Sequence, residues 1–359
     1  MSDEKYLIDK RLDSWLNEQP PDCFPPTKEA TYQNKYERIS QFLNNNVHSE
    51  AELSALIQEI RKSPSTIPYD QLIYLNNHGP GHVDQVIDRA TELIIKTNCM
   101  LSAYEVYLLL ISIHFHDVGN IFGRDSHEVK SIKVMRELGN LAGNDEPEKR
   151  VILDIAAAHC GNYNGDRDKI GRLERSSHLL GKHVRYRLLA GILRLADELA
   201  DDSSRSSRFA AIAGLIPPGS EIFHAYSSSL HTVVLDGSDV RLAYEFDKQN
   251  ALRRFIKNDN QVFLFDEILA RVLKMHIERS YCMRFLRPEV KVPLERILVK
   301  ISICNNFDSC EVIETLDLRT FSLEEKGYPL SPVEGIVSLC PDLNGITGQM
   351  ISEKLSQGD

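Results

Sequence analysis

The sequence predicts a mainly α-helical fold with a smaller α+β portion toward the C-terminus. Three observations lead to this prediction. Apolar residues recur at helical spacing through most of residues 32–201, the stretch from Leu230 to Phe246 alternates around an Asp-Gly pair as β-hairpins do, and no internal repeat or low-complexity tract interrupts the chain. We expect an N-terminal helical extension at residues 1–70, a helical domain at residues 71–205 and an α+β portion at residues 206–359.

Composition narrows the class of protein. The 359 residues are 42% hydrophobic, enough for a sizeable core, and carry a formal net charge of −10. That charge argues against broad binding to nucleic acid, which depends on Lys and Arg neutralising phosphates. The longest apolar run, from about Val106 to Phe115, is shorter than the ~18 residues that span a membrane. With no apolar signal region after Met1 and no CxxC pair among seven cysteines, we expect a cytoplasmic protein with reduced thiols and no membrane partner.

The N-terminal part is expected to begin with a short polar segment. It ends in Pro20-Pro-Asp-Cys-Phe-Pro-Pro26, which is typical of a linker because proline interrupts helices. Two amphipathic helices are predicted after it, from Tyr32 to Leu43 and from Ser49 to Arg61. Ser49 and Glu52 have the spacing of a capping box, so they mark the start of the second helix.

Five further helices are predicted to carry a polar side chain on an apolar face or at one end. The first begins near His82, after the turn Leu75–His82, and the second is a buried helix from Ser102 to Phe115 that His116-Asp117 follows and Gly119 ends. His127 opens the third, His159 lies on the fourth (Arg150 to Cys160), and Asp197 is embedded in the fifth (His183 to Asp201). These helices would direct their polar groups toward one interior.

Beyond Asp202 the sequence pattern changes from helices alone to a mixture of predicted strands and helices. The hairpin Leu230–Phe246 is followed by two predicted helices, Gln249 to Ile256 and Phe263 to Phe285, and by two predicted strands, Leu298–Ile303 and Glu311–Thr315. The end of the chain, Pro332 to Leu355, is predicted to be helical with a break at Pro341 and Gly345. The segment from about Ser203 to Phe246 is a candidate lid or dimer contact, because it leaves the last polar helix directly.

Each inward polar residue has a structural explanation when taken alone. A single histidine in a core is commonly a hydrogen-bonded packing residue, and Arg194, one turn before Asp197, is a candidate ion-pair partner for it. Together they would leave too many buried polar groups to satisfy without a metal. Imidazole with carboxylate is the ligand set of a hydrolytic divalent metal. We therefore predict that the metal ligands are His82, His116, Asp117, His127, His159 and Asp197.

This pattern resembles the HD-domain metal-dependent phosphohydrolases. The matches are His82 in Gly-His-Val-Asp-Gln-Val86, His116-Asp117 in Phe-His-Asp-Val-Gly119, and Asp197 in Leu-Ala-Asp-Glu-Leu-Ala-Asp201. The resemblance covers roughly Leu75 to Asp202 and implies an HD-type helical bundle with one or two divalent ions, Mn, Fe, Mg or Zn. Some branches, including cyclic-dinucleotide phosphodiesterases, hold a second metal with two more histidines, and His127 and His159 sit where those would be. Asp117 would then bridge the two ions.

The resemblance also implies a reaction. A metal-activated water would cleave a phosphoester bond of a small phosphorylated substrate, a nucleotide or cyclic (di)nucleotide, with Asp117, His116 and Arg194 as catalytic residues. Many relatives have a phosphate-contacting lysine where this chain has Asn120. Candidate replacements and further substrate contacts are Arg124, Lys182, Arg187, Arg194 and His78, and Asp201 takes the place of a nucleotide-contacting residue in guanosine tetraphosphate hydrolases.

Two alternatives remain open at this point. One is a regulatory HD module that binds a nucleotide or a partner protein without turnover, which the absent lysine favours and the full ligand set opposes. The other is a nuclease for single strands, which the acidic charge opposes. The sequence has no Gly-rich phosphate loop, dinucleotide fingerprint or nucleophile elbow. The sequence does not decide whether the protein forms a homo-oligomer.

Overall fold

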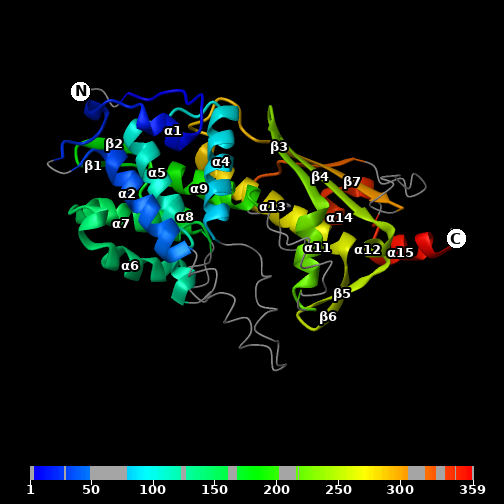
Figure 1. The fold of residues 1–359 in the computed structure, drawn as a ribbon. Coiled ribbons are helices and arrows are strands. Elements are labelled where there is room, and N and C mark those ends of the chain that lie inside the picture. Colours follow the sequence, from blue (N-terminus) through cyan, green and yellow to red (C-terminus); the bar gives the residue numbers. More distant parts are fainter. Residues whose placement is uncertain are drawn as a thin grey trace. The chain divides into compact units, whose positions relative to one another are not determined.

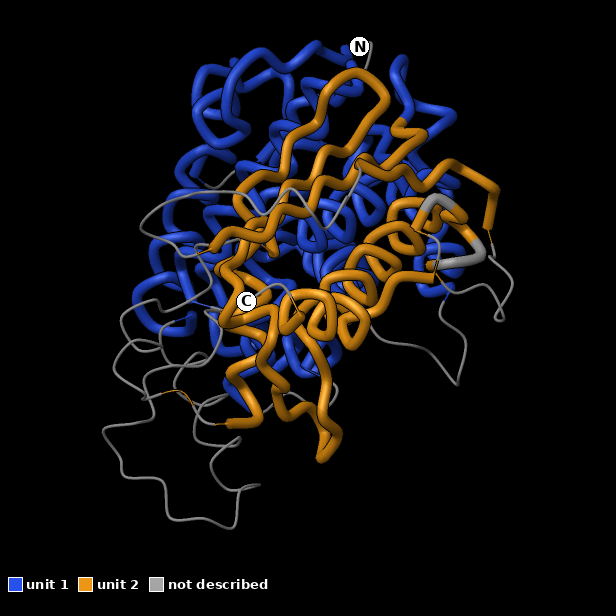
Figure 2. Tube along the Cα trace, turned by 90° about the vertical axis from the view of Figure 1, so that its right-hand side faces the viewer, with its two compact units in different colours: residues 1–66, 77–200, 282–293 blue, residues 67–76, 201–281, 294–359 orange. Residues whose placement is uncertain are grey.

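The computed structural model describes residues 4–27, 30–48, 79–122, 127–160, 168–201, 216, 218–305, 320–328, 336–343 and 345–357. The chain forms two compact units (Figure 2): unit 1 comprises residues 1–66, 77–200 and 282–293, and unit 2 comprises residues 67–76, 201–281 and 294–359. The elements confirm a mainly α fold with a smaller α+β part.

Unit 1 is built from helices and one short hairpin (Figure 1). Its α-helices are α1 (Leu12–Asn17), α2 (Tyr32–Leu43), α4 (Pro80–Lys96), α5 (Ala103–Phe115), α6 (His127–Leu138), α7 (Glu146–Ala157), α8 (Lys169–Arg172) and α9 (Tyr186–Leu199). The short elements are the 3-10 helices η1 (Pro21–Cys23), η4 (Val118–Phe122) and η5 (Gly139–Ala142), the π-helical turn η2 (Asn44–His48), and strands β1 (Ser177–Leu179) and β2 (Lys182–Val184).

Helix α5 is the core of unit 1. Every residue from Ala103 to Phe115 is buried, and α1, α2, α4, α7 and α9 all pack against it. Ser102 accepts a hydrogen bond from the Glu105 backbone N–H, and the Glu105 carboxylate accepts one from the Ser102 backbone N–H, so a capping box fixes the first turn. The chain that leaves the other end of α5 therefore emerges inside the unit.

Two buried ion pairs fix neighbouring helices to α5. Arg185, just before α9, donates to both carboxylate oxygens of Glu105 at 2.8 and 2.6 Å. On α2, Lys35 pairs with the buried carboxylate of Glu148 on α7, which also accepts a hydrogen bond from the Tyr104 hydroxyl at 2.7 Å. Because a buried charge costs several kcal/mol unless it is paired, these contacts define how the helices pack.

Unit 2 combines a four-stranded sheet with helices. Its elements are α11 (Glu221–Ser229), β3 (Leu230–Asp236), β4 (Asp239–Asp247), α12 (Lys248–Leu252), β5 (Arg254–Lys257), β6 (Asn260–Phe263), α13 (Leu264–Leu286), β7 (Arg296–Cys304), β8 (Phe321–Glu324), α14 (Ile336–Leu339), η8 (Pro341–Leu343) and α15 (Gly348–Gln357). The sheet order is β3-β4-β7-β8; β4 and β7 are parallel, and the other neighbours are antiparallel. From Cys282 onward, α13 belongs to unit 1.

Several predicted elements are found as expected. Helix α2 has the predicted bounds, α4 begins two residues before His82, and α13 and β7 lie within two residues of their predictions. The hairpin turns at Gly237, whose φ of +60° suits a residue without a side chain. The predictions for residues 49–61 and 311–315 lie outside the described residues.

Other predictions are wrong. The N-terminal segment is not simply polar, because Trp15 and Leu16 of α1 are buried. Helix α7 runs from Glu146 to Ala157 rather than from Arg150 to Cys160, so it ends before His159. Helix α9 starts at Tyr186 because the preceding residues pair as the β1–β2 hairpin. The predicted helix at residues 249–256 is replaced in its second half by β5, which pairs with β6.

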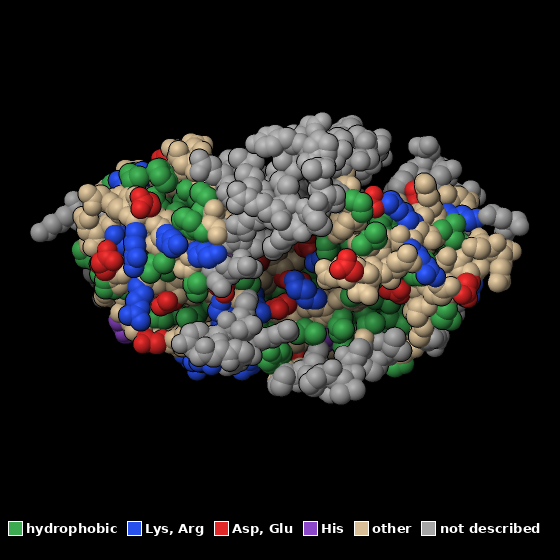
Figure 3. Space-filling model, turned by 90° about the horizontal axis from the view of Figure 1, so that it is seen from below, with side chains coloured by type: hydrophobic (Ala, Val, Ile, Leu, Met, Phe, Trp, Pro, Cys, Tyr) green, Lys and Arg blue, Asp and Glu red, His purple; other side chains and the backbone are tan. Residues whose placement is uncertain are grey.

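The surface of unit 1 mixes charges of both signs. On the face in Figure 3, Lys and Arg side chains on the left stand beside Asp and Glu side chains and hydrophobic ones. In the described part of the chain, no single helix is both long and apolar enough to cross a membrane.

Candidate metal centre

His82 enters the interior of unit 1 on the first turn of α4. Gly79 precedes this helix and Pro80 occupies its first position, where the missing proline N–H would have had no helical partner anyway. His82 shares the buried face of α4 with Val83 and Val86. Its Nε2 lies 3.1 Å from Oδ1 of Asp197, a residue of the last turn of α9.

The His116-Asp117 pair lies directly after the buried helix α5. Nδ1 of His116 donates a hydrogen bond to the Ile113 carbonyl oxygen at 2.6 Å, so Nε2 carries the lone pair. His116 and Asp117 are both buried, and the backbone continues into η4. The end of α5 thus presents one imidazole nitrogen and two carboxylate oxygens in the interior.

Gly119 positions the next histidine by letting the backbone approach closely. A Cβ built on Gly119 would lie 1.8 Å from the backbone carbonyl oxygen of His127, the first residue of α6. No side chain fits at such a distance. The glycine therefore allows η4 and α6 to pack against each other, which places His127 beside Asp117.

His159 and Cys160 follow the end of α7 rather than lying on it. Nδ1 of His159 donates to the Ala156 carbonyl oxygen at 2.7 Å, which again leaves the lone pair on Nε2. The backbone oxygen of Cys160 accepts a hydrogen bond from Lys169 of α8 at 2.8 Å. Because both residues follow the end of α7, the backbone can direct these two consecutive side chains toward the same group of imidazoles.

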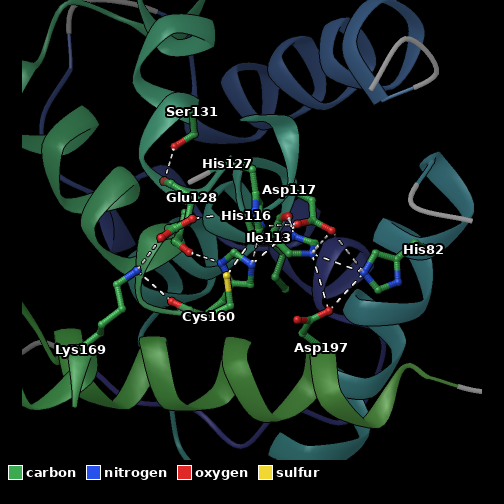
Figure 4. Close-up of polar contacts among 12 residues, drawn as sticks. His82, Ile113, His116, Asp117, His127, Glu128, Ser131, Cys160, Lys169 and Asp197 are labelled. Carbon is green, nitrogen blue, oxygen red and sulfur yellow. Dashed lines mark hydrogen bonds and ion pairs between the residues drawn. The ribbon is translucent and has the colours of Figure 1, made fainter. Parts of the chain in front are cut away.

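The structure brings the other five predicted ligand residues together around Asp117, and Figure 4 shows four of them, His82, His116, His127 and Asp197. On the Oδ2 side, His116 Nε2 lies 3.4 Å and His82 Nε2 lies 3.9 Å from this oxygen. The two imidazole nitrogens are 3.4 Å apart, and Asp197 Oδ1 is 3.7 Å from His116 Nε2. These four residues form the first half-site.

The second half-site lies on the Oδ1 side of the same carboxylate. His127 Nε2 is 3.1 Å and His159 Nε2 is 3.7 Å from Asp117 Oδ1, and the two nitrogens are 3.4 Å apart. Cys160 Sγ lies 3.6 Å from His127 Nε2. Within each of two groups, His82–His116–Asp117 and His127–His159–Cys160, the donor atoms all lie within 4.8 Å of one another.

The electrostatics of the centre favour bound positive charge. Burial alone would lower the pKa of His116, but the carboxylates of Asp117 and Asp197 raise it to about 9. Burial likewise opposes the charge on His127, yet Asp117 and Cys160 raise its pKa to about 11. Although burial disfavours the charged form of Asp197, the hydrogen bond from His82 and the charge of His116 hold its pKa below the usual range. The convergent lone pairs and carboxylates therefore fit a cation as well as protons.

A comparison with models of known protein families identifies the family of this chain. The HD-CE family model matches residues 69–272, which is more than half of the chain. The chain belongs to the HD-CE family. This agrees with the HD-type relation expected from the sequence, and the match includes all residues of both half-sites. A search of curated proteins found no match.

In this HD-CE protein, the residues expected to contact substrate are spread more widely. Lys182 donates to the backbone oxygen of Asp22 at 3.2 Å, and Arg187 donates to that of Leu173 at 2.7 Å. Asp201 belongs to unit 2 and pairs there with Arg271 at 3.6 Å. The predictions for His78 and Arg124 fall outside the described residues.

Arg194 lies on α9, one turn before Asp197. It is buried, and its guanidinium donates to the carbonyl oxygen of Ala158 at 3.4 Å, next to His159 in the chain. A purely structural explanation of Asp197 would pair it with Arg194, whereas Oδ1 of Asp197 lies 3.1 Å from Nε2 of His82. Arg194 therefore sits against the backbone that carries the second half-site.

Cys160 is a member of the second half-site that was not among the predicted ligands. No two of the seven cysteines have the CxxC spacing of a metal site, so their spacing offered no reason to select one of them. The one signal for Cys160 was its position next to His159. Burial by itself raises the pKa of the Cys160 thiol, but His159 and His127 lower it to about 6. The HD-CE centre thus contains a thiol next to its second pair of imidazoles.

Proposed function

We propose that the protein is a metal-dependent phosphohydrolase that cleaves a phosphoester bond of a nucleotide or cyclic (di)nucleotide. The observation that carries this proposal is the Asp117 carboxylate, which directs one oxygen to each of two groups of imidazole nitrogens. A carboxylate between two sets of ligands is the arrangement that two-metal hydrolytic sites need. Membership of the HD-CE family supports it.

The chain's own groups fit one or two divalent ions. His82, His116, Asp117 and Asp197 would hold the first, and Asp117, His127, His159 and Cys160 would hold the second. Imidazole-rich sets suit Mn²⁺, Fe²⁺ or Zn²⁺ better than Mg²⁺, which prefers oxygen ligands. Such ions lower the pKa of a bound water and neutralise phosphate charge, which is the chemistry that hydrolysis of a phosphoester requires.

The surrounding residues would orient these ligands. The Ile113 and Ala156 carbonyls fix the tautomers of His116 and His159. Lys169 holds the Cys160 backbone and also pairs with Glu128 at 3.3 Å, which ties α8 to α6 at the edge of the second half-site.

Arg194 is our candidate for contacting the substrate phosphate, since an arginine fork matches phosphate oxygens. In an Arg194→Gln variant we expect a KM at least tenfold higher with an unchanged metal content, because the guanidinium donates to a carbonyl and is not a metal ligand. Loss of the metal in this variant would instead give Arg194 a purely structural role.

The proposal is tested on protein purified without chelator. We expect elemental analysis to find a transition metal, and a screen of a model phosphodiester, nucleoside phosphates, cyclic nucleotides and cyclic dinucleotides to find turnover. Asp197→Asn should lower both metal content and rate by at least tenfold. The matched control is Asp154→Asn on α7, whose exposed carboxylate pairs with Arg150 at 3.8 Å and which should behave as wild type.

Three outcomes separate the candidate functions. Protein without a transition metal and without hydrolysis across a series of added metals would contradict the proposal. Metal and nucleotide binding without turnover would favour a regulatory HD module. Turnover of single-stranded oligonucleotides with salt-dependent binding would favour a nuclease.

A further inference from the structure

A cavity lies within unit 1 at the start of α9, at the end of that helix opposite Asp197. Its volume is about 630 Å³, which lies in the range of small-molecule sites. Ten residues separate Arg187 in its wall from Asp197, which corresponds to about 15 Å along a helix axis. The cavity is therefore separate from the metal centre, although one helix contributes to both.

The wall of this cavity is strongly basic. Its cationic side chains are Lys5, Arg175, Arg185, Arg187 and Arg284. Glu289 supplies one carboxylate, and it is paired with Arg185 at 2.8 Å. Such a concentration of positive charge is notable in a chain whose formal net charge is −10, and it would attract an anion with several charges.

Buried contacts hold part of this wall rigid. Arg185 is 5% exposed and is fixed by Glu105 and Glu289. Arg187 is oriented by the hydrogen bond from its Nε to the Leu173 carbonyl oxygen. The ion pair of Arg284 with Asp168, at 3.3 Å, is exposed, and exposed pairs contribute little. A phosphate in this cavity would contact Arg187 on α9, whose guanidinium is already oriented, and Arg284 on α13, whose ion pair with Asp168 is weak.

An apolar surface completes the cavity. Leu188, Phe285 and Pro288 line it, and the Arg284 guanidinium lies 5.1 Å from the centroid of the Phe285 ring. An aromatic ring with an adjacent arginine is a surface on which a nucleic acid base can stack. Basic groups beside an apolar patch thus match a molecule that has phosphates at one end and a flat ring at the other.

We propose that this cavity binds a nucleoside di- or triphosphate at a site separate from the metal centre. Arg187 and Arg284 contact its phosphates, and Phe285 contacts its base. The site requires neither turnover nor a bound metal, so it can exist whether or not the protein is a phosphohydrolase.

The test measures binding of ADP and ATP by calorimetry in the presence of EDTA. The full-length chain should bind both, adenosine should bind more weakly, and affinity should fall with salt because the contacts are ionic. Arg187→Gln and Arg284→Gln should each weaken ADP binding at least tenfold. The matched control is Arg150→Gln on α7, which is exposed and does not line this cavity.

A third variant distinguishes the two sites. Asp117→Asn alters the metal centre and should leave ADP binding in EDTA unchanged. The inference is overturned if ADP fails to bind, if the Arg187 and Arg284 variants, with a wild-type circular dichroism spectrum, bind as wild type, or if Asp117→Asn abolishes binding. Absence of hydrolysis would contradict the proposed function and leave this inference standing.

Discussion

Replacing Asp117 with asparagine is the perturbation that tests the centre most directly. The variant keeps the size of the side chain but removes its negative charge, and it leaves one carbonyl oxygen where two carboxylate oxygens face the two half-sites at 3.1–3.9 Å. We therefore expect Asp117→Asn to weaken both metal positions. Asp197→Asn should weaken the first only, because Asp197 contacts His82 and His116.

The expected size of the effect follows from binding linkage. A metal present at 100 times its Kd stabilises the folded state by about 2.7 kcal/mol. Unit 1 has about 200 residues, and in a domain of that size about 1 kcal/mol shifts the Tm by about 2–4 °C. Added metal should therefore raise the wild-type Tm by about 5–10 °C. If Asp117→Asn weakens binding about 100-fold, the same metal concentration stabilises by about 0.4 kcal/mol and raises the Tm by about 1 °C.

The assay is differential scanning fluorimetry of chelator-treated protein across a titration of Mn²⁺ or Zn²⁺, with elemental analysis for stoichiometry. Each variant is compared with its own metal-free Tm, so effects of the substitution on folding cancel. Wild type should retain up to two ions, Asp197→Asn fewer and Asp117→Asn least, with Asp154→Asn as the unchanged control. A wild-type Tm increase and wild-type metal content in Asp117→Asn would refute the bridging role.

Three further outcomes follow from particular residues. Gly119→Ala should displace His127, because its Cβ would meet the His127 backbone oxygen, and elemental analysis should show loss of the second ion with the first retained. Cys160→Ser should remove a sulfur-to-cobalt charge-transfer band from the Co²⁺-loaded protein, whereas Cys23→Ser should keep it. Burial and the charge of Arg279 lower the pKa of His276 to about 4 in the folded protein. In the unfolded chain this histidine has a pKa of about 6.5, so acid protonates the unfolded state first. The folded state therefore loses stability as pH falls below about 6.5. Urea unfolding at pH 7 and pH 5 measures this loss. Between these two pH values, the free energy of unfolding should fall by about 2 kcal/mol less in His276→Gln than in wild type.

Local signals predicted the elements that carry the first half-site. Helix α5 was predicted from its apolar run, and α4 from apolar residues at helical spacing after His82; the structure adds a Ser102–Glu105 capping box to the first and Pro80 to the start of the second. The β3–β4 hairpin follows from alternation around Asp236-Gly237. In each case the residues that define the element are neighbours in the chain.

Elements defined by distant residues were not predictable in the same way. Helix α9 follows the β1–β2 hairpin, and Arg185, the residue before it, donates from its backbone N–H and guanidinium to Glu105, 80 residues away. The parallel pairing of β4 with β7 was not predictable either, because parallel strands are joined by a long connection and no short turn in the sequence marks the pair. The sequence pattern could select the six ligand residues, but it could not divide them into two half-sites or add Cys160, since both depend on how five chain segments meet.

The position of Asn120 shows how the structure changes the interpretation of one departure from the family pattern. A missing lysine suggested a weakened phosphate site. Asn120, however, is a buried residue of η4, and its backbone N–H donates to the Asp117 carbonyl oxygen at 2.9 Å. This position stabilises the turn after the ligand pair. A buried cationic side chain lies nearby on α9, where Arg194 donates to the carbonyl oxygen of Ala158, the residue before His159. Substituting lysine for Asn120 would therefore bury a charge without restoring a phosphate contact, and Arg194 is the residue on which phosphate binding at the metal centre should depend.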